Sequence, residues 1–91
     1  MANEEQLSIS KQGVKVWNEW REMNPTIRID LSAADLRGAF LQEVDLRSTD
    51  LSSAILTDAN LHRADLSASN LKAAKLNDAN LSKCLLRSRR A

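Results

Sequence analysis

The sequence predicts an all-β solenoid of about three coils, preceded by an α-helical cap. Three observations predict it. A leucine stands at every fifth position from Leu31 to Leu86, a small residue usually stands two positions before each leucine, and Asp or Asn commonly lies between them. The 91 residues suffice for one domain. We divide it into residues 1–28, the capping helix and its connection, and residues 29–91, the repeats with a short basic C-terminal tail.

A five-residue spacing fits neither regular element. On an α-helix, steps of five rotate by about 140°, and on one continuous strand an odd step sends alternate leucines to opposite faces. Within each pentad, the small residue and the leucine are two apart, so a short extended piece points both to one side and the Asp or Asn to the other. The next two residues must then turn the chain. Four such corners close a square, which gives about 20 residues per coil.

The leucines form the predicted core. Four leucines and four alanine-sized residues per coil can fill a narrow axis at close-packed density, and stacked coils pair their extended pieces about 4.8 Å apart. Thr49 and Ser69 occupy the small inner position, where we expect their hydroxyls to bond the backbone or each other. The core leucines are Leu31, Leu36, Leu41, Leu46, Leu51, Leu56, Leu61, Leu66, Leu71, Leu76, Leu81 and Leu86.

The repeated unit resembles that of the pentapeptide repeat family, whose pattern is A(D/N)LXX. The matching runs are Ala34-Asp35-Leu36-Arg37-Gly38-Ala39, Ala59-Asn60-Leu61, Ala64-Asp65-Leu66 and Ala79-Asn80-Leu81. The resemblance covers about two thirds of the chain. It implies a right-handed quadrilateral β-helix, which agrees with the square coil. The chain departs from the pattern where Phe40, Ile55, Lys75 and Leu85 replace the outward Asp or Asn, and where Ile29 and Val44 fill the small position.

The first residues predict one helix from Asn3 to about Met23, ended by Pro25. Asn3 can cap it while Gln6 reaches back in a capping box, and Gly13 weakens its middle only slightly. An open coil end exposes leucines and unpaired strand edges, so we expect this helix to cover the first coil, with Trp17 and Trp20 as a lid. Its apolar arc consists of Leu7, Ile9, Val14, Val16, Trp17, Trp20 and Met23.

Four apolar residues form a possible interface. No cap is visible after Leu85 and Leu86, so the basic residues that follow either form a solvated tail or accompany an end that meets a second copy or a further domain. Phe40 and Ile55 are apolar at outward positions on adjacent faces. Either one of them packs beneath the N-terminal helix, or they form a partner-binding patch.

We expect no catalytic, cofactor-binding or metal-binding residues. His62 follows Leu61 on an outward corner near Asp65, and no nucleophile is fixed against it, so it is interpreted as a surface residue. Cys84 fills a small inner position and is interpreted as a buried structural thiol. Outward Asp and Asn side chains, stacked 20 residues apart, are expected to bond backbone groups at the corners rather than hold a cation. These are Asp30, Asp50, Asp45, Asp65, Asn60 and Asn80.

Charge and composition limit the classes of function that we expect for this chain. The 13 Lys and Arg against 12 Asp and Glu leave a net charge of +1, so we expect no direct nucleic-acid binding. No apolar run approaches a membrane span, and a single cysteine fits the cytoplasm. We therefore expect a non-enzymatic interaction or scaffold module without a cofactor, whose protein partner is unidentified and includes a possible homodimer through the C-terminal coil.

Two other functions stay open. Some pentapeptide repeat proteins act as DNA-like rods that regulate a DNA topoisomerase, but a column of about three coils is short and a charge of +1 is wrong for a polyanion mimic. The chain could also be the N-terminal module of a larger multidomain signalling protein.

Overall fold

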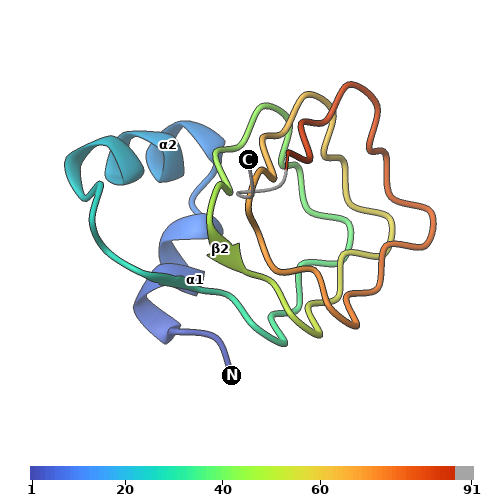
Figure 1. Ribbon diagram of the computed structural model, residues 1–91, viewed down its shortest axis with the longest axis horizontal. Helices are drawn as coiled ribbons and strands as arrows, with labels where there is room; N and C mark the ends of the chain where they lie inside the picture. Colours follow the sequence, from blue (N-terminus) through green and yellow to red (C-terminus); the bar gives the residue numbers. More distant parts are fainter. Residues whose placement is uncertain (88–91) are drawn as a thin grey trace.

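The computed structural model describes residues 1–87. Helices α1 (Glu4–Ser10) and α2 (Val14–Met23) come first. Strands β1 (Ile29–Asp30) and β2 (Thr49–Asp50) follow and pair in parallel, with Ile29 opposite Thr49. Figure 1 shows the two helices packed at one end of a chain that winds repeatedly around a common axis.

The winding repeats every 20 residues. Single parallel bridges join residues that are 20 positions apart, so Phe40 pairs with Asn60, and Asn60 pairs with Asn80. The predicted solenoid is confirmed in its general form, although within residues 1–87 the hydrogen bonds form regular strand only in β1 and β2. The other extended pieces are too short to form regular strands and make only single bridges. The other bridges join Asp35 to Ile55, Asp45 to Asp65, Asp50 to Asn70, Ile55 to Lys75 and Asp65 to Leu85.

Neighbouring coils share one hydrogen-bond pattern. Leu36 N–H donates to the Ile55 carbonyl at 2.8 Å, Gly38 N–H donates to the Thr57 carbonyl at 2.9 Å, and Ile55 N–H donates back to the Ala34 carbonyl at 2.9 Å. The two edges of a coil therefore differ. The edge toward the N-terminus carries one N–H and two C=O groups per side, and the edge toward the C-terminus carries two N–H groups and one C=O.

Each corner is a tight turn. At the first corner the Ala34 N–H donates to the Leu31 carbonyl at 3.1 Å, and the intervening Ala33 has φ 59°. A positive φ at the third residue of a β-turn is typical of type II geometry. The second residue after each leucine, which we call the corner residue, has this conformation from Ala33 to Lys83. Only Gly38 among them is a glycine.

The outward Asp and Asn side chains bond the corners, as predicted. Asp30 Oδ1 accepts the backbone N–H of Ser32 at 2.9 Å, and Asn60 Oδ1 accepts that of His62 at 3.1 Å. The same bond closes the corners after Asp35, Asp45, Asp50, Asp65, Asn70 and Asn80.

The core is deepest in the first two coils. The eight leucines from Leu31 to Leu66 are at most 4% exposed, whereas Leu71, Leu76 and Leu81 are half-buried and Leu86 is 58% exposed. The last four predicted core leucines thus line an open end, where no further coil within residues 1–87 covers them.

The two inner hydroxyls bond the backbone and not each other. Thr49 Oγ1 donates to the Arg47 carbonyl at 3.2 Å, and Ser69 Oγ donates to the Leu66 carbonyl at 2.6 Å. Thr49 is buried and Ser69 is half-buried. Because each hydroxyl reaches a carbonyl of its own corner, the small inner position tolerates a polar side chain.

The prediction of one continuous N-terminal helix is wrong. The helix ends at Ser10, and α2 begins at Val14 after Gly13, whose φ of 114° is a conformation that other residues rarely adopt. Gly13 therefore separates two helices instead of weakening one. Met23 also departs from the predicted apolar arc, because its side chain is 81% exposed.

The predicted capping box forms only in part. The Gln6 N–H donates to Asn3 Oδ1 at 3.0 Å, which confirms Asn3 as the cap of α1. The Gln6 side chain does not return to the Asn3 N–H, because that group donates to the Asp30 carbonyl at 2.8 Å. The Gln6 amide contacts the start of the solenoid instead.

Candidate interaction surfaces

The indole of Trp17 joins α2 to the first coil. Trp17 is completely buried in the core cluster, and its Nε1–H donates to the Asp45 carbonyl at 2.7 Å. Trp20 is half-buried against the same cluster, with its ring centroid 5.4 Å from that of Trp17. Both rings thus pack with the apolar core cluster, and Trp17 satisfies one carbonyl of the coil edge.

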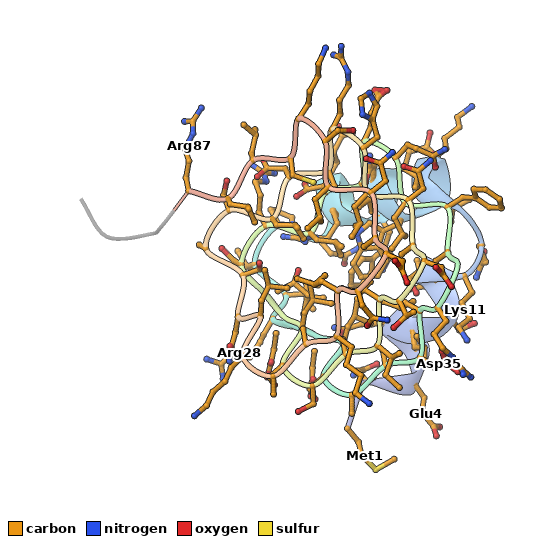
Figure 2. All side chains as sticks on the ribbon, turned by 90° about the vertical axis from the view of Figure 1, so that its right-hand side faces the viewer. Met1, Glu4, Lys11, Arg28, Asp35 and Arg87 are labelled. Carbon is orange, nitrogen blue, oxygen red and sulfur yellow. The ribbon has the colours of Figure 1, made fainter. Side chains whose placement is uncertain are left out.

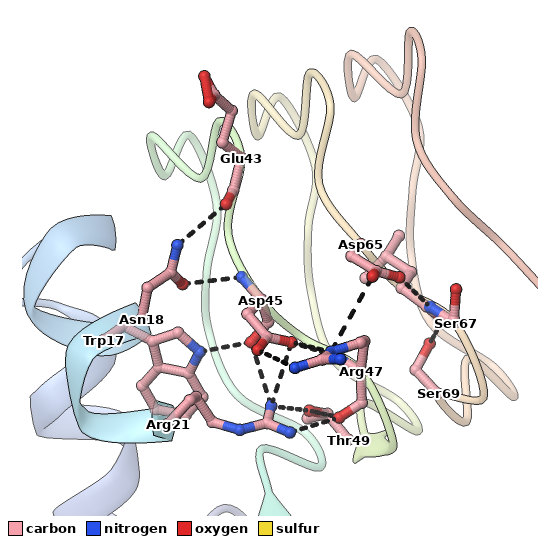
Figure 3. A network of polar contacts seen from close by, with 11 residues as sticks. Trp17, Asn18, Arg21, Glu43, Asp45, Arg47, Thr49, Asp65, Ser67 and Ser69 are labelled. Atoms are coloured by element: carbon pink, nitrogen blue, oxygen red, sulfur yellow. Dashed lines mark hydrogen bonds and ion pairs between the residues drawn. The ribbon is translucent and has the colours of Figure 1, made fainter. Parts of the chain in front are cut away.

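Two side-chain amides replace peptide groups of an absent coil. Asn18 Oδ1 accepts the Asp45 N–H at 2.8 Å while its Nδ2 donates to the Glu43 carbonyl at 3.1 Å (Figure 3). Gln6 does the same on the adjacent side, where its Oε1 accepts the Asp30 N–H at 2.8 Å and its Nε2 donates to the Arg28 carbonyl at 2.9 Å. The helices thus complete the coil edge at Asp30 and Asp45.

Arg21 strengthens the second of these attachments. Its guanidinium donates to the carbonyls of Asp45 at 3.1 Å and Arg47 at 2.9 Å, and it lies 3.9 Å from Asp45 Oδ1. Burial raises the pKa of Asp45, but hydrogen bonds from the Arg47 side chain and backbone, with the charges of Arg21 and Arg47, bring that pKa below its usual value. Burial lowers the pKa of Arg21, and the charge of Asp45 opposes this.

Among the described residues, the last coil of the solenoid has an open edge. Within the described part of the chain, the backbone N–H groups of Leu76 and Leu81 and the carbonyls of Ala74 and Ala79 have no hydrogen-bond partner. Leu86 is exposed beside them, while Leu85 pairs with the coil before it through both of its backbone groups. Figure 2 views this end directly. Of the predicted basic tail, residues 88–91 lie outside the described residues.

Phe40 and Ile55 differ in their surroundings. Phe40 is 78% exposed, so it does not pack beneath the helices, and it borders a hollow of about 340 Å³ between the first coil and the α1–α2 connection. Ile55 is half-buried on the second coil, in the column between Asp35 and Lys75. The two side chains therefore stand at different levels, and Phe40 is the more accessible.

His62 has a hydroxyl neighbour that the sequence did not reveal. Its Nδ1 lies 2.6 Å from Ser82 Oγ, which belongs to the next coil toward the C-terminus. Arg63 Nε donates to the Nε2 of His62 at 3.3 Å. Since Ser82 Oγ donates to Asn80 Oδ1 at 2.7 Å, these partners assign the proton to Nδ1. His62 then donates toward Ser82, the reverse of what a general base requires.

Cys84 is less buried than expected. It is half-buried, because it belongs to the last coil, and its Sγ donates to the Leu61 carbonyl at 2.9 Å. Burial raises the pKa of the Cys84 thiol. A raised pKa favours the protonated thiol, which is the less nucleophilic form.

The described residues 1–87 contain no candidate metal site and no candidate membrane-spanning helix. No group of three or more His, Cys, Asp or Glu residues there could hold a metal ion. The helices of this part of the chain are too short or too polar to cross a membrane.

The sequence did not predict which polar residues attach the helices to the first coil. Asn18 follows Trp17 directly and Arg21 lies four positions after it, so the indole and the guanidinium occupy one helical face. Polar residues beside a buried tryptophan were the available signal. It indicates an edge of backbone groups that needs partners.

Comparison with known sequences agrees with the geometry. The sequence model of pentapeptide repeats matches residues 29–67 and 64–88, in eight copies. No curated protein matches the chain. The matched segments together span residues 29–88, which is well over half of the sequence. They coincide with the part that winds in 20-residue coils, and the chain therefore belongs to the pentapeptide repeat family.

Proposed function

We propose that this chain is a non-enzymatic interaction module whose C-terminal end binds a second copy of itself. The supporting observation is the open last coil, where half-buried leucines and the exposed Leu86 adjoin backbone groups without partners in residues 1–87. An apolar surface edged with unpaired strand groups favours association.

The backbone groups of this end favour a second copy of the same end. On the side of Lys75 the edge offers the Ala74 carbonyl and the Leu76 N–H, and the next side repeats this with Ala79 and Leu81. In an antiparallel pair, the N–H and C=O groups that flank one residue bond those that flank the residue opposite. A two-fold rotation therefore places these N–H groups opposite these carbonyls, so this part of the edge complements itself. The additional N–H groups at the corner residues Asp78 and Lys83 stay outside the pairing.

The proposal also specifies the fold of the two parts of the chain. Residues 29–91 comprise a right-handed quadrilateral β-helix of about three coils with a short basic C-terminal tail, as the family resemblance implies, and residues 1–28 form its cap with Trp17 and Trp20 as the lid. The 20-residue pairing and the buried Trp17 support this division. We place the protein in the cytoplasm, where its single thiol stays reduced.

The solution mass tests the proposal. We expect multi-angle light scattering to give a dimer at high concentration that dissociates on dilution. Leu86→Glu should yield a monomer, because a charge on the apolar surface opposes its burial. Since Leu86 is exposed, this variant should retain the circular dichroism and thermal unfolding of the wild type.

Met23→Glu is the matched control. Met23 is another exposed apolar residue, but it lies on α2 at the opposite end, so its replacement should leave the dimer intact. A protein that is monomeric at every concentration, or a dimer that Leu86→Glu leaves unchanged, would contradict the proposal.

A covalent continuation of the chain is the alternative that the same observation favours. As the N-terminal module of a larger signalling protein, the chain would cover its open end with the next domain. A monomer whose amides at Leu76 and Leu81 exchange rapidly in this chain, but slowly in a longer natural chain, would select that function over the homodimer.

A further inference from the structure

The first coil is capped on only two of its four sides. The helices satisfy the N–H and C=O groups of Asp30 and Asp45. On the sides of Asp35 and Phe40, the corresponding N–H and C=O groups have no hydrogen-bond partner within residues 1–87. Two adjacent sides of the coil thus keep a free strand edge, which we call the open quadrant.

The open quadrant has the hydrogen-bonding groups of one missing coil. Each of its sides offers one N–H, from Asp35 or Phe40, and two carbonyls, from Asp35 and Arg37 or from Phe40 and Gln42. Between coils the same three groups bond a parallel chain, as Ile55 and Thr57 show with Leu36 and Gly38. A short peptide in extended conformation supplies the same complement.

A hollow adjoins this edge. It has a volume of about 340 Å³, and one wall is formed by Ser10 at the end of α1 with Lys11 and Gly13 of the α1–α2 connection. The coil forms the other wall with the backbone and side chains near Asp35 and Phe40. Its size is at the lower end of ligand pockets, which are roughly 300–1,000 Å³, and it therefore suits a short peptide segment rather than a folded domain.

The charged side chains at the hollow favour an acidic peptide. Lys11 and Asp35 lie near each other on the same side of the molecule (Figure 2), and the Asp35 carboxylate is already held by Arg37 through bonds of 2.9 and 2.8 Å. Lys11 has no ion-pair partner among the described residues, and the residues that line the hollow carry two basic groups, Lys11 and Arg37, against one carboxylate, Asp35, a net charge of +1. An acidic peptide complements it, with an apolar side chain against Phe40.

We propose that the open quadrant binds an acidic, extended peptide segment of a partner protein as an added parallel strand. The site is independent of the proposed dimer, because the dimer uses the other end of the solenoid. It follows from three coincident features: unpaired backbone groups at Asp35 and Phe40, an exposed aromatic ring, and a positively charged wall at Lys11.

The test uses the full chain and the synthetic peptide Ala-Asp-Leu-Glu-Ser-Ala-Val-Leu-Glu-Ser, whose Val pairs with Phe40 in the register that the coils use. Titration by calorimetry should show binding, and the amide exchange of Asp35 and Phe40 should slow when the peptide is present. Phe40→Ala should weaken binding by roughly tenfold, as loss of an interface aromatic does. Lys11→Glu should weaken it as well, and more strongly at low salt.

Two further peptides separate strand addition from simple charge attraction. The same peptide N-methylated at both leucines lacks the N–H groups that would bond the carbonyls of Asp35 and Phe40, so it should not bind. A basic version, Ala-Asn-Leu-Lys-Ser-Ala-Val-Leu-Lys-Ser, should bind at least tenfold more weakly than the acidic one, a difference of about 1.4 kcal/mol.

Controls keep this result distinct from the dimer. Met23→Ala and Leu86→Glu should both leave peptide affinity unchanged, because they lie on the outer surface of α2 and at the C-terminal end. The proposal is wrong if the acidic peptide does not bind, if the N-methylated or basic peptide binds equally well, or if the exchange changes map to the C-terminal end.

Discussion

At the scale of single residues, the corners contain most of the unusual backbone conformations. Corner residues such as Ala33, Glu43 and Arg63 adopt φ values near 60°, which L-residues reach at roughly 1–2 kcal/mol each. Hydrogen bonds to the next coil hold them there, as between the Ala33 N–H and the Ser52 carbonyl at 2.8 Å. The pentad pattern located every corner but not its conformation, since these residues have no turn-specific identity.

Replacing Gly38, the one glycine among the corner residues, measures the free-energy cost of a positive φ for a residue with a side chain. Gly38 has φ 65°, and an added Cβ would meet no atom within 4 Å. We therefore expect Gly38→Ala to lower the free energy of unfolding by roughly 1 kcal/mol without any packing change. Urea denaturation followed by circular dichroism gives the value. Gly13→Ala, at φ 114°, should destabilise more, and a stabilised Gly38→Ala would contradict this explanation.

The Asp35 carboxyl provides a pH-dependent readout of one corner. Hydrogen bonds from the Arg37 side chain and backbone lower the pKa of Asp35 from 3.8 to about 2. Because this pKa is depressed in the folded state, the stability it contributes is present above pH 3.8 and is lost as the pH falls toward about 2. NMR titration should give the low pKa, and Arg37→Gln should return it toward 3.8. An unchanged pKa in that variant would exclude the Arg37 side chain as the main cause.

At the scale of elements, α1 and α2 attach to the coil largely through side chains that act as peptide groups. The sequence predicted helical structure in this segment and Asn3 as the helix N-cap, but not the break at Gly13, because a glycine inside a helical pattern ordinarily costs only about 1 kcal/mol. The attachment by Gln6 and Asn18 was also missed. Asn18 lies next to a buried tryptophan, which was a usable signal, whereas no such neighbour distinguishes Gln6 from an exposed amide on a helix.

Asn18 provides the test of this attachment. Asn18→Asp retains the acceptor for the Asp45 N–H but loses the donor to the Glu43 carbonyl, and it places a charge beside that carbonyl. We expect a loss of about 1–3 kcal/mol in unfolding free energy. Asn18→Ala should in addition speed amide exchange at Asp45, whereas exchange at Asn60 should stay close to that of the wild type. Equal acceleration at both amides would indicate general destabilisation instead.

At the scale of the whole molecule, the solenoid has a gradient of burial from the capped end to the open end. Leu56 and Leu76 hold the same position in their pentads, yet Leu56 is completely buried and Leu76 only half-buried. The sequence could not distinguish them, because burial here depends on the number of coils stacked on either side. In such linear arrays each coil is stabilised mainly by its immediate neighbours.

Paired leucine truncations test the gradient. Leu56→Ala should destabilise the fold by roughly 2–5 kcal/mol, since it empties a fully enclosed position. Leu76→Ala, on the same side one coil later, should cost clearly less. Thermal and urea unfolding of both variants measure the difference. Equal losses would show that the last coil is as enclosed as the second, contrary to the structure.

The 20-residue return of the chain also has a geometric consequence for changes in its length. Each pentad advances the chain by a quarter of a revolution, because four of them bring Asp35 to Ile55. Inserting one pentad in the middle of the solenoid would therefore rotate all following residues by a quarter turn relative to the helices. Inserting four pentads would restore their orientation and lengthen the solenoid by one coil. Length and orientation can thus be adjusted separately by counting pentads.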